Sequence, residues 1–260
     1  MLSPGDPRGG PVLQIDLNCD MGEGMPSDAD IFPFISSANI ACGAHAGDDA
    51  TMRLTVERAL RHGVAIGAHP SYPDREGFGR VDILGSSLSP EDLPDLLTDQ
   101  LERLQKICQE SGARLHHVKP HGALYNRAAK DPAVSALIVH AVAGFDPSLF
   151  LYGLSGSEME KQAAAGGLSF VSEVFADRRY RADGSLVPRT EPHALIEDPD
   201  EAIAQVLKMV CERRVRVGEM EVPLRADTIC IHGDGSHAAG FARMIHEVLL
   251  ENGIVIKHLL

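Results

Sequence analysis

The 260-residue chain lacks the surface charge and the long apolar segments that several classes of protein need. Its 24 Lys and Arg residues stand against 37 Asp and Glu residues, so the formal net charge is −13. Nucleic acids and anionic membranes bind to basic surfaces, so this composition argues against both as partners. No apolar run approaches the ~20 residues that cross a bilayer. The composition does not exclude small phosphate-bearing ligands, because binding them needs only a few local cations.

Cysteine is scarce, and a secretion signal is missing. The five cysteines are odd in number, lie far apart and form no CxxC pair. This pattern is typical of a reduced cytosolic chain and not of a disulfide framework. Residues 1–11 are rich in Pro and Gly and lack the apolar stretch of a signal peptide. We therefore expect a cytoplasmic protein that begins with a flexible tail over residues 1–11.

The best-known nucleotide-binding motifs are also missing. The chain has no GxxxxGK[ST] phosphate loop, and the first predicted strand ends in DLNCDMGEG instead of the GxGxxG of a dinucleotide-binding fold. Any nucleotide would therefore be held in another way. No HExxH motif fixes a metal site either.

The hydrophobic pattern predicts strands that alternate with helices. Short runs rich in β-branched residues predict strands at 12–17, 37–42, 64–69, 115–120, 149–154, 168–175 and 228–233. Helix starts are predicted at the pairs Ser89-Pro90, Asp131-Pro132 and Asp198-Pro199, and helix ends at Gly63 and Gly112. Such alternation implies parallel strands with right-handed crossovers. We expect one α/β domain over residues 12–260, a seven-stranded (β/α) TIM-like barrel, with a doubly wound sheet as the competing fold.

Polar residues gather where these predicted strands end. They are Asp16, Asn18, Asp20, Glu23, His45, Asp48, His69, Lys119, His121, Arg178, His232 and Asp234. The carboxyl ends of the strands of a parallel barrel meet at one rim, where active sites are built. Each residue alone also has a structural interpretation, since Asp and Asn side chains often satisfy loop amides. Their repetition along the chain predicts a site.

Five residues carry positive charge to this rim. Lys119 directly follows a buried strand, and a lysine there needs an ionic partner or a ligand because a stranded buried charge is costly. Arg80, Arg178, Arg181 and Arg189 are suited to bind phosphate or carboxylate with two parallel hydrogen bonds.

Together, these segments resemble the LamB/YcsF family of 5-oxoprolinase A subunits. The similarity runs in order from about residue 12 to 257 through DLNCDMGEG (16–24), SANIACGAHAGD (37–48), IGAHPSYPDREGFGR (66–80), VKPHGALYN (118–126), EVFADRRY (173–180), DGSLVPR (183–189) and ICIHGD (229–234). The resemblance implies a barrel of the glycoside hydrolase/deacetylase type. It also implies ATP-dependent opening of 5-oxo-L-proline to L-glutamate, together with partner subunits B and C.

The implied reaction assigns roles to the rim residues. Phosphorylation of the lactam oxygen needs cations for the phosphoryl group, a base for water and an acid for the departing nitrogen. We expect Asp16, His69, Lys119 and His121 to be catalytic. We expect the substrate or its phosphate to contact Asn18, Glu23, Asp48, Arg80, Arg178, Arg189, His232 and Asp234. ATP is the expected co-substrate, with Mg²⁺.

Two other functions fit the same residues. The first is a stand-alone metal-dependent hydrolase or deacetylase that acts on a small amide or carbohydrate, with Asp20, His45 and His69 as ligands of a divalent ion and Asp16 as the base. The second is a non-catalytic member of a complex. The sequence also leaves open whether the chain forms a homo-oligomer.

Overall fold

The structure is a computed structural model that describes residues 12–231 and 238–260. The predicted tail at 1–11 and the predicted site residues His232 and Asp234 lie outside the described residues.

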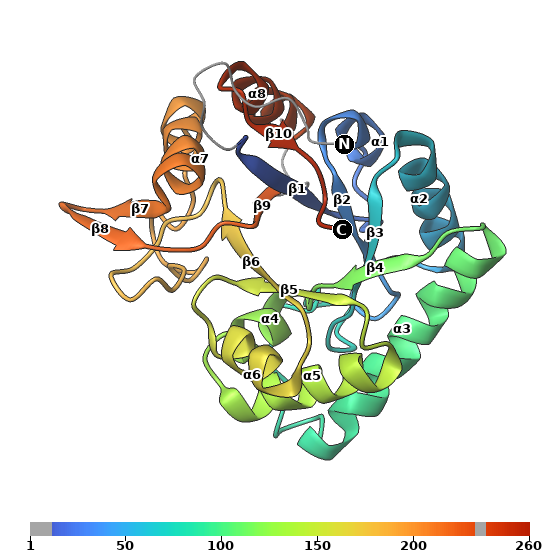
Figure 1. The fold of residues 1–260 in the computed structure, drawn as a ribbon. Coiled ribbons are helices and arrows are strands. Elements are labelled where there is room, and N and C mark those ends of the chain that lie inside the picture. The colour runs from blue at the N-terminus through green and yellow to red at the C-terminus, as the bar shows by residue number, and fades with distance from the viewer. Residues whose placement is uncertain (1–11, 232–237) are drawn as a thin grey trace.

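Seven parallel strands close into a barrel (Figure 1). The barrel strands are β1 (Gln14–Met21), β2 (Ser37–Ala41), β3 (Ala65–His69), β4 (Leu115–Val118), β5 (Phe150–Leu154), β6 (Phe170–Phe175) and β9 (Thr228–Ile231). They neighbour one another in chain order, and β9 pairs with β1 to close the ring. A short strand, β10 (Val255–Ile256), pairs with the start of β1. The predicted seven-stranded (β/α) barrel is confirmed, and the doubly wound sheet is excluded.

Helices surround the barrel and begin largely at the predicted signals. They are α1 (Asp28–Ile31), η1 (Phe32–Phe34), α2 (Asp49–His62), η2 (Pro90–Asp92), α3 (Leu93–Glu110), α4 (Gly122–Ala128), α5 (Pro132–Phe145), α6 (Glu158–Gly166), α7 (Pro199–Glu212) and α8 (Ala238–Glu251). The Asp131 and Asp198 side chains accept hydrogen bonds from the first amides of α5 and α7, as N-cap residues do. Ser89 begins the short η2, and α3 itself starts at Leu93.

Apolar side chains fill the layer between the strands and the helices. In α3, Leu97, Leu101 and Leu104 recur at helical spacing and are buried. Full burial of such a side chain contributes roughly 1.5–3 kcal/mol. In β1, Leu17 and Cys19 belong to this apolar core.

The inside of the barrel is polar instead. On β1, Asp16, Asn18 and Asp20 alternate with the apolar residues and form hydrogen bonds to other strands. This alternation follows from the two-residue period of a strand. The polar column leads to the carboxyl ends of the strands, where the predicted site residues lie.

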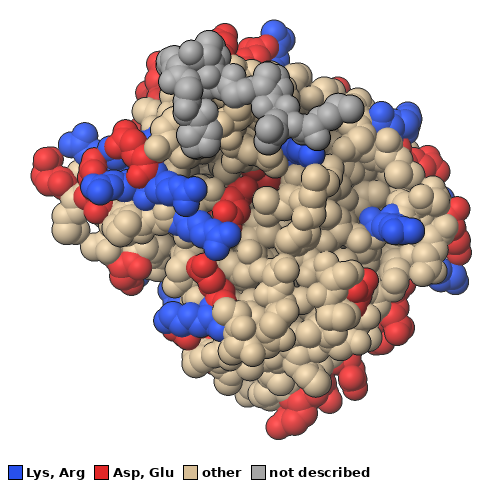
Figure 2. All heavy atoms as spheres, viewed as in Figure 1, with Lys and Arg blue, Asp and Glu red and all other residues tan. Residues whose placement is uncertain are grey.

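Three further features bear on the predictions made from the sequence. All five cysteines are unpaired, which confirms that the chain has no disulfide framework. Among the described residues, no helix has the length and apolarity needed to cross a membrane. An antiparallel hairpin, β7 (Arg214–Val217) and β8 (Met220–Pro223), was not predicted and projects from the barrel (Figure 1). On the face drawn in Figure 2, basic and acidic side chains are mixed near this hairpin.

Candidate active site

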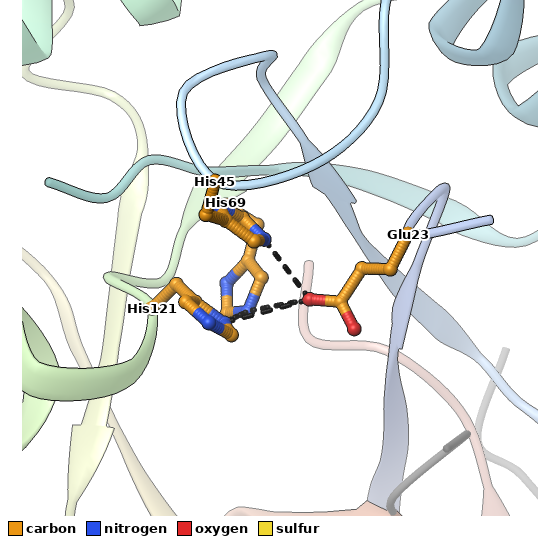
Figure 3. Close-up of side chains that lie close together, drawn as sticks. All are labelled: Glu23, His45, His69 and His121. Atoms are coloured by element: carbon orange, nitrogen blue, oxygen red, sulfur yellow. Dashed lines mark hydrogen bonds and ion pairs between the residues drawn. The ribbon is translucent and has the colours of Figure 1, made fainter. Parts of the chain in front are cut away.

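Three imidazoles and one carboxylate meet at the carboxyl ends of the first four strands (Figure 3). Glu23 follows β1, His45 follows β2, His69 ends β3 and His121 follows β4. One side-chain atom from each lies within 4.8 Å of the corresponding atom of every other. Glu23 Oε1 lies 3.0 Å from His45 Nε2, 3.5 Å from His121 Nδ1 and 4.0 Å from His69 Nε2. We call these four residues the imidazole cluster.

Burial keeps two of the imidazoles neutral. The pKa of His45 is lowered to about 3, first by burial and then by the nearby His69. The pKa of His121 is lowered to about 2 by burial and by the neighbouring His69 and His45. The rings of His45 and His121 stack with their centroids 3.8 Å apart. At neutral pH both side chains are therefore bases with available lone pairs.

The local backbone explains how His69, Lys119 and His121 reach the same place. The Lys119 amide donates to the Ala68 carbonyl, so the chain stays paired beyond the end of β4. Gly122 then turns with a φ of +56°, and a Cβ atom there would lie 2.4 Å from the Gly79 carbonyl oxygen. Only glycine fits this turn, which directs the chain into α4 immediately after His121.

Lys119 lies beside the imidazole cluster, and its buried ammonium group pairs with two carboxylates. Its Nζ atom lies 2.9 Å from Asp20 Oδ1 and 2.8 Å from Glu173 Oε1. Burial alone would lower the pKa of Lys119, but Asp20 and Glu173 outweigh it, and this pKa is well above its ordinary value. Burial would likewise raise the pKa of Asp20, but His69 and Lys119 hold it well below its ordinary value. The lysine thus has the ionic partner that its position requires.

A pocket of about 620 Å³ opens over these groups. This volume lies within the range of small-molecule sites. Of the predicted site residues, it is lined by Asp20, Glu23, His69, Arg80, Lys119, His121, Arg178 and Arg189. The structure therefore brings most of the predicted rim into one cavity.

Arg178, Arg181 and Arg189 make up a second wall of the pocket, which we call the arginine wall. Arg178 is buried, and its Nη2 donates to the Val187 carbonyl at 2.6 Å, while its Nε has no hydrogen-bond partner among the described residues. Burial and the nearby Arg189 lower the pKa of Arg178. An anion in the pocket would stabilise the buried charge of Arg178, because it would supply both a hydrogen-bond acceptor for Nε and a compensating negative charge.

Asp16 lies elsewhere than predicted. It precedes Asp20 by four residues on β1, which places it about 13 Å deeper in the barrel. Its carboxylate accepts hydrogen bonds from the hydroxyls of Ser36, Ser37, Tyr152 and Thr228 at 2.6 to 3.0 Å. It does not line the pocket. These contacts favour a structural role for Asp16 over proton transfer to a ligand.

Two other predicted ligand contacts also lie away from the pocket. Asp48 is exposed and caps α2 by accepting a hydrogen bond from the Thr51 amide. Asn18 is buried below Lys119 and donates to Glu173 and Thr228. The Asp48 contact is the local one that Asx side chains often make, whereas Asn18 links β1 to β6 and β9 across the barrel.

Some site residues were missed by the sequence reasoning. Glu173 pairs with Lys119, and the Tyr125 hydroxyl donates to Glu173 at 2.7 Å. Arg181, by contrast, was identified from the sequence as available to bind phosphate or carboxylate, and it lines the pocket. Glu173 was recognised from the sequence as a polar residue near the end of a predicted strand, but no role in the site was predicted for it. Tyr125 lies inside α4, which was not predicted as an element.

The sequence model of the LamB/YcsF family matches residues 15–260. The chain belongs to the LamB/YcsF family. The match includes every residue of the imidazole cluster and of the arginine wall.

Close relatives within this family share about half of the sequence. A protein from Tolumonas auensis, named as the A subunit of 5-oxoprolinase, is 51% identical over 252 residues, which cover 95% of this chain and 99% of the relative. A protein of the same name from Bordetella parapertussis is 53% identical over 249 residues, which cover 94% and 98% of the two chains.

A solved structure of similar sequence has the same fold. The lactam utilization protein of Thermus thermophilus matches with a TM-score of 0.88 and 41% identity, over 95% of this chain and 100% of that one. The barrel fold is thus shared with a protein of known structure over nearly the whole chain.

Proposed function

We propose that this chain is the A subunit of an ATP-dependent 5-oxoprolinase, which opens 5-oxo-L-proline to L-glutamate with partner subunits B and C. The observation that carries the proposal is a single pocket with two chemically different walls, in a chain about 50% identical to proteins named as 5-oxoprolinase A subunits. One wall holds Glu23, His69 and His121, and the other holds arginines.

The two ends of the proposed substrate match the two walls of the pocket. 5-Oxoproline has a carboxylate at one end of its ring and an uncharged lactam at the other. Arg178 and Arg189 would bind the carboxylate or a phosphoryl group. The lactam would then face the imidazole cluster and Lys119. The pocket volume of about 620 Å³ exceeds the needs of one five-membered ring, which leaves room for a phosphoryl donor.

The chemistry needs activation because an amide carbon is a poor electrophile. Transfer of a phosphoryl group from ATP, with Mg²⁺, to the lactam oxygen would release ADP and make the former carbonyl carbon electrophilic enough for water to add. The ring C–N bond would then break as the nitrogen takes a proton, and hydrolysis of the resulting acyl phosphate by a second water would release phosphate and L-glutamate. His69 and His121 would move protons between water and the ring nitrogen. The arginines and Lys119 would stabilise the developing negative charge.

The test is an assay for ADP and L-glutamate from ATP and 5-oxo-L-proline, with the chain alone and with co-expressed B and C subunits. We expect coupled formation of both products in the complex and little from the isolated chain. Full turnover by the chain alone would reject the partner requirement, and no glutamate from the complete complex would reject the substrate.

The imidazole cluster favours a second candidate, a metal-dependent hydrolase of a small amide that acts without ATP. Its donor set is of the kind that binds transition metals. Hydrolysis of 5-oxoproline or another small amide by the metal-loaded chain, without ATP and without partners, would favour this candidate over the first.

A further inference from the structure

The hydrogen bonds of the imidazole cluster leave its central atoms as acceptors facing one another, an arrangement that a bound cation would stabilise. Each of its three histidines has one ring nitrogen facing outward and one facing the centre. The partner of the outward nitrogen decides which nitrogen carries the hydrogen, because a neutral imidazole has only one N–H.

All three outward nitrogens are donors. His69 Nδ1 lies 2.7 Å from the Lys119 carbonyl oxygen, and His121 Nε2 lies 2.9 Å from the Phe78 carbonyl oxygen. A carbonyl oxygen only accepts, so both nitrogens carry the hydrogen. His45 Nδ1 lies 2.8 Å from Ser71 Oγ. The Ser71 hydroxyl donates to the Tyr72 carbonyl, so Ser71 Oγ also accepts from the imidazole.

The three inward nitrogens therefore present lone pairs to one another. His69 Nε2 and His121 Nδ1 lie only 2.9 Å apart. Glu23 Oε1 adds a carboxylate oxygen 3.0 Å from His45 Nε2, and Asp20 Oδ2 lies 3.4 Å from His69 Nε2. Lone pairs and negative charge at such distances repel unless a cation lies between them.

We infer that Glu23, His45, His69 and His121 form a binding site for one divalent transition-metal ion of the zinc class. Zinc bonds to His nitrogens and carboxylate oxygens are about 2.0–2.2 Å long, so the ligand atoms of a tetrahedral site lie roughly 3.3 Å apart. The distances of 2.9, 3.0, 3.5 and 4.0 Å within the cluster fall on either side of this value. Three imidazoles favour zinc, cobalt or nickel over Mg²⁺, which prefers oxygen ligands.

The ligands differ from those that the sequence predicted. Glu23 and His121 join His45 and His69. Asp20 is outside this set of four: its Oδ1 is bound by Lys119 and Asn39, and only its Oδ2 faces the cluster, 3.4 Å from His69 Nε2. The contacts to Lys119, Phe78 and Ser71 act as the outer hydrogen bonds that orient metal-ligating histidines. With an ion bound, His69 and His121 would be ligands, so the metal-loaded chain could not use them for the proton transfers given to them in the proposed function, and those two roles are alternatives.

Metal uptake by the isolated full-length chain tests the site without ATP, 5-oxoproline or partners, so it is independent of the proposed function. The untagged protein is stripped with a chelator and titrated with Zn²⁺, Co²⁺ and Mg²⁺, with metal content, the visible spectrum of Co²⁺ and Tm as readouts. We expect about one Zn²⁺ per chain, a higher Tm, a tetrahedral Co²⁺ spectrum and no competition from Mg²⁺.

Variants identify the ligands. Glu23→Gln and His121→Asn should each weaken Zn²⁺ binding by at least about 100-fold, and Ser71→Ala, which removes the acceptor for His45, by about 10–100-fold. His140→Asn, at an exposed position on α5, is the matched control and should bind as the wild type does. If the wild type takes up no Zn²⁺ and its Tm does not change, the inference is wrong, and a proton between His69 and His121 stabilises the facing nitrogens instead. Equal uptake by wild type and Glu23→Gln would also overturn the site as defined.

Discussion

At the residue scale, Lys119 places a positive charge inside the barrel, where it needs ionic partners. It is buried and balances two carboxylates, Asp20 and Glu173. Its replacement leaves both carboxylates buried and without their cation. The sequence left open whether this lysine serves a ligand or an ion pair, and the structure places it in an ion pair at the wall of the pocket.

We expect Lys119→Ala to lower the free energy of unfolding by about 3–5 kcal/mol, because truncating one partner of a buried pair leaves uncompensated charge. Urea denaturation measures the loss. The control is Lys161→Ala, which removes an exposed pair with Glu158 and should cost less than about 1 kcal/mol. Equal stability of Lys119→Ala and wild type would contradict the ion-pair role.

Arg178 and Arg179 offer a matched pair for testing the arginine wall. Arg178 is buried at the pocket, whereas Arg179 is an exposed neighbour that pairs with Glu201. In the complete 5-oxoprolinase complex, Arg178→Gln should lower kcat/KM by about 10–100-fold, since a hydrogen bond to a charged group contributes about 1.5–3 kcal/mol. Arg179→Gln should have little effect. Similar values of kcat/KM for the two variants would remove Arg178 from the site.

At the element scale, the connection from β4 to α4 positions His121. The connection includes Gly122, whose positive φ and close contact with the Gly79 carbonyl exclude other residues. On the facing loop, Phe78 has a φ of +56° and aims its carbonyl at His121. A positive φ is strained for a bulky side chain, and the surrounding loop holds it in place. The two loops thus fix the ring of His121 from both sides.

We expect Gly122→Ala to destabilise the protein by at least about 1–3 kcal/mol, because alanine must adopt a left-handed backbone against a carbonyl group. The comparison is Gly144→Ala in α5, where a Cβ atom meets nothing within 4 Å and where alanine should stabilise the helix by about 0.5–1 kcal/mol. Thermal unfolding of both variants measures the difference. If Gly122→Ala is as stable as wild type, the turn at this position can accept a Cβ atom and the steric argument is wrong.

At the scale of the whole molecule, the barrel closes around a polar column instead of an apolar one. His117 Nε2 lies 2.8 Å from Asn39 Oδ1, and its ring stacks on Tyr152. His116 Nε2 lies 2.7 Å from the Leu259 carbonyl, at the other end of the barrel. Burial first, and then neighbouring charges, hold the pKa of His117 well below its ordinary value, and burial also lowers the pKa of His116.

This column makes stability depend on pH. In the unfolded chain His117, His45 and His121 take up protons below about pH 6.5, whereas in the folded chain burial holds their pKa values well below that pH and they stay neutral. The unfolded state therefore binds more protons, and stability present above pH 6.5 is lost as the pH falls. Between about pH 6.5 and 5, each such histidine changes the unfolding free energy by up to about 1.4 kcal/mol per pH unit. Urea denaturation at stepped pH measures the slope, and a flat profile over this window would contradict the prediction.

The sequence by itself determined the elements and the order in which they meet. Hydrophobic runs of strand length, separated by N-cap and proline signals, predicted all seven barrel strands and the starts of α5 and α7. This worked because local periodicity and capping depend on residues close together in the chain. The polar strand ends predicted the rim, since parallel strands end on one side. In this way Glu23, His45, His69, Lys119 and His121 were found.

Only the tertiary structure decided what each polar residue does. Asp16 and Asp20 have the same chemistry on the same strand, yet one is enclosed by hydroxyls and the other faces Lys119 and His69. Likewise, Asp48 follows a strand as His45 does, but it caps a helix. The direction of an imidazole lone pair depends on carbonyls 40 to 50 positions away in the chain. Such contacts exist only once the barrel has closed, because closure brings the strand ends together.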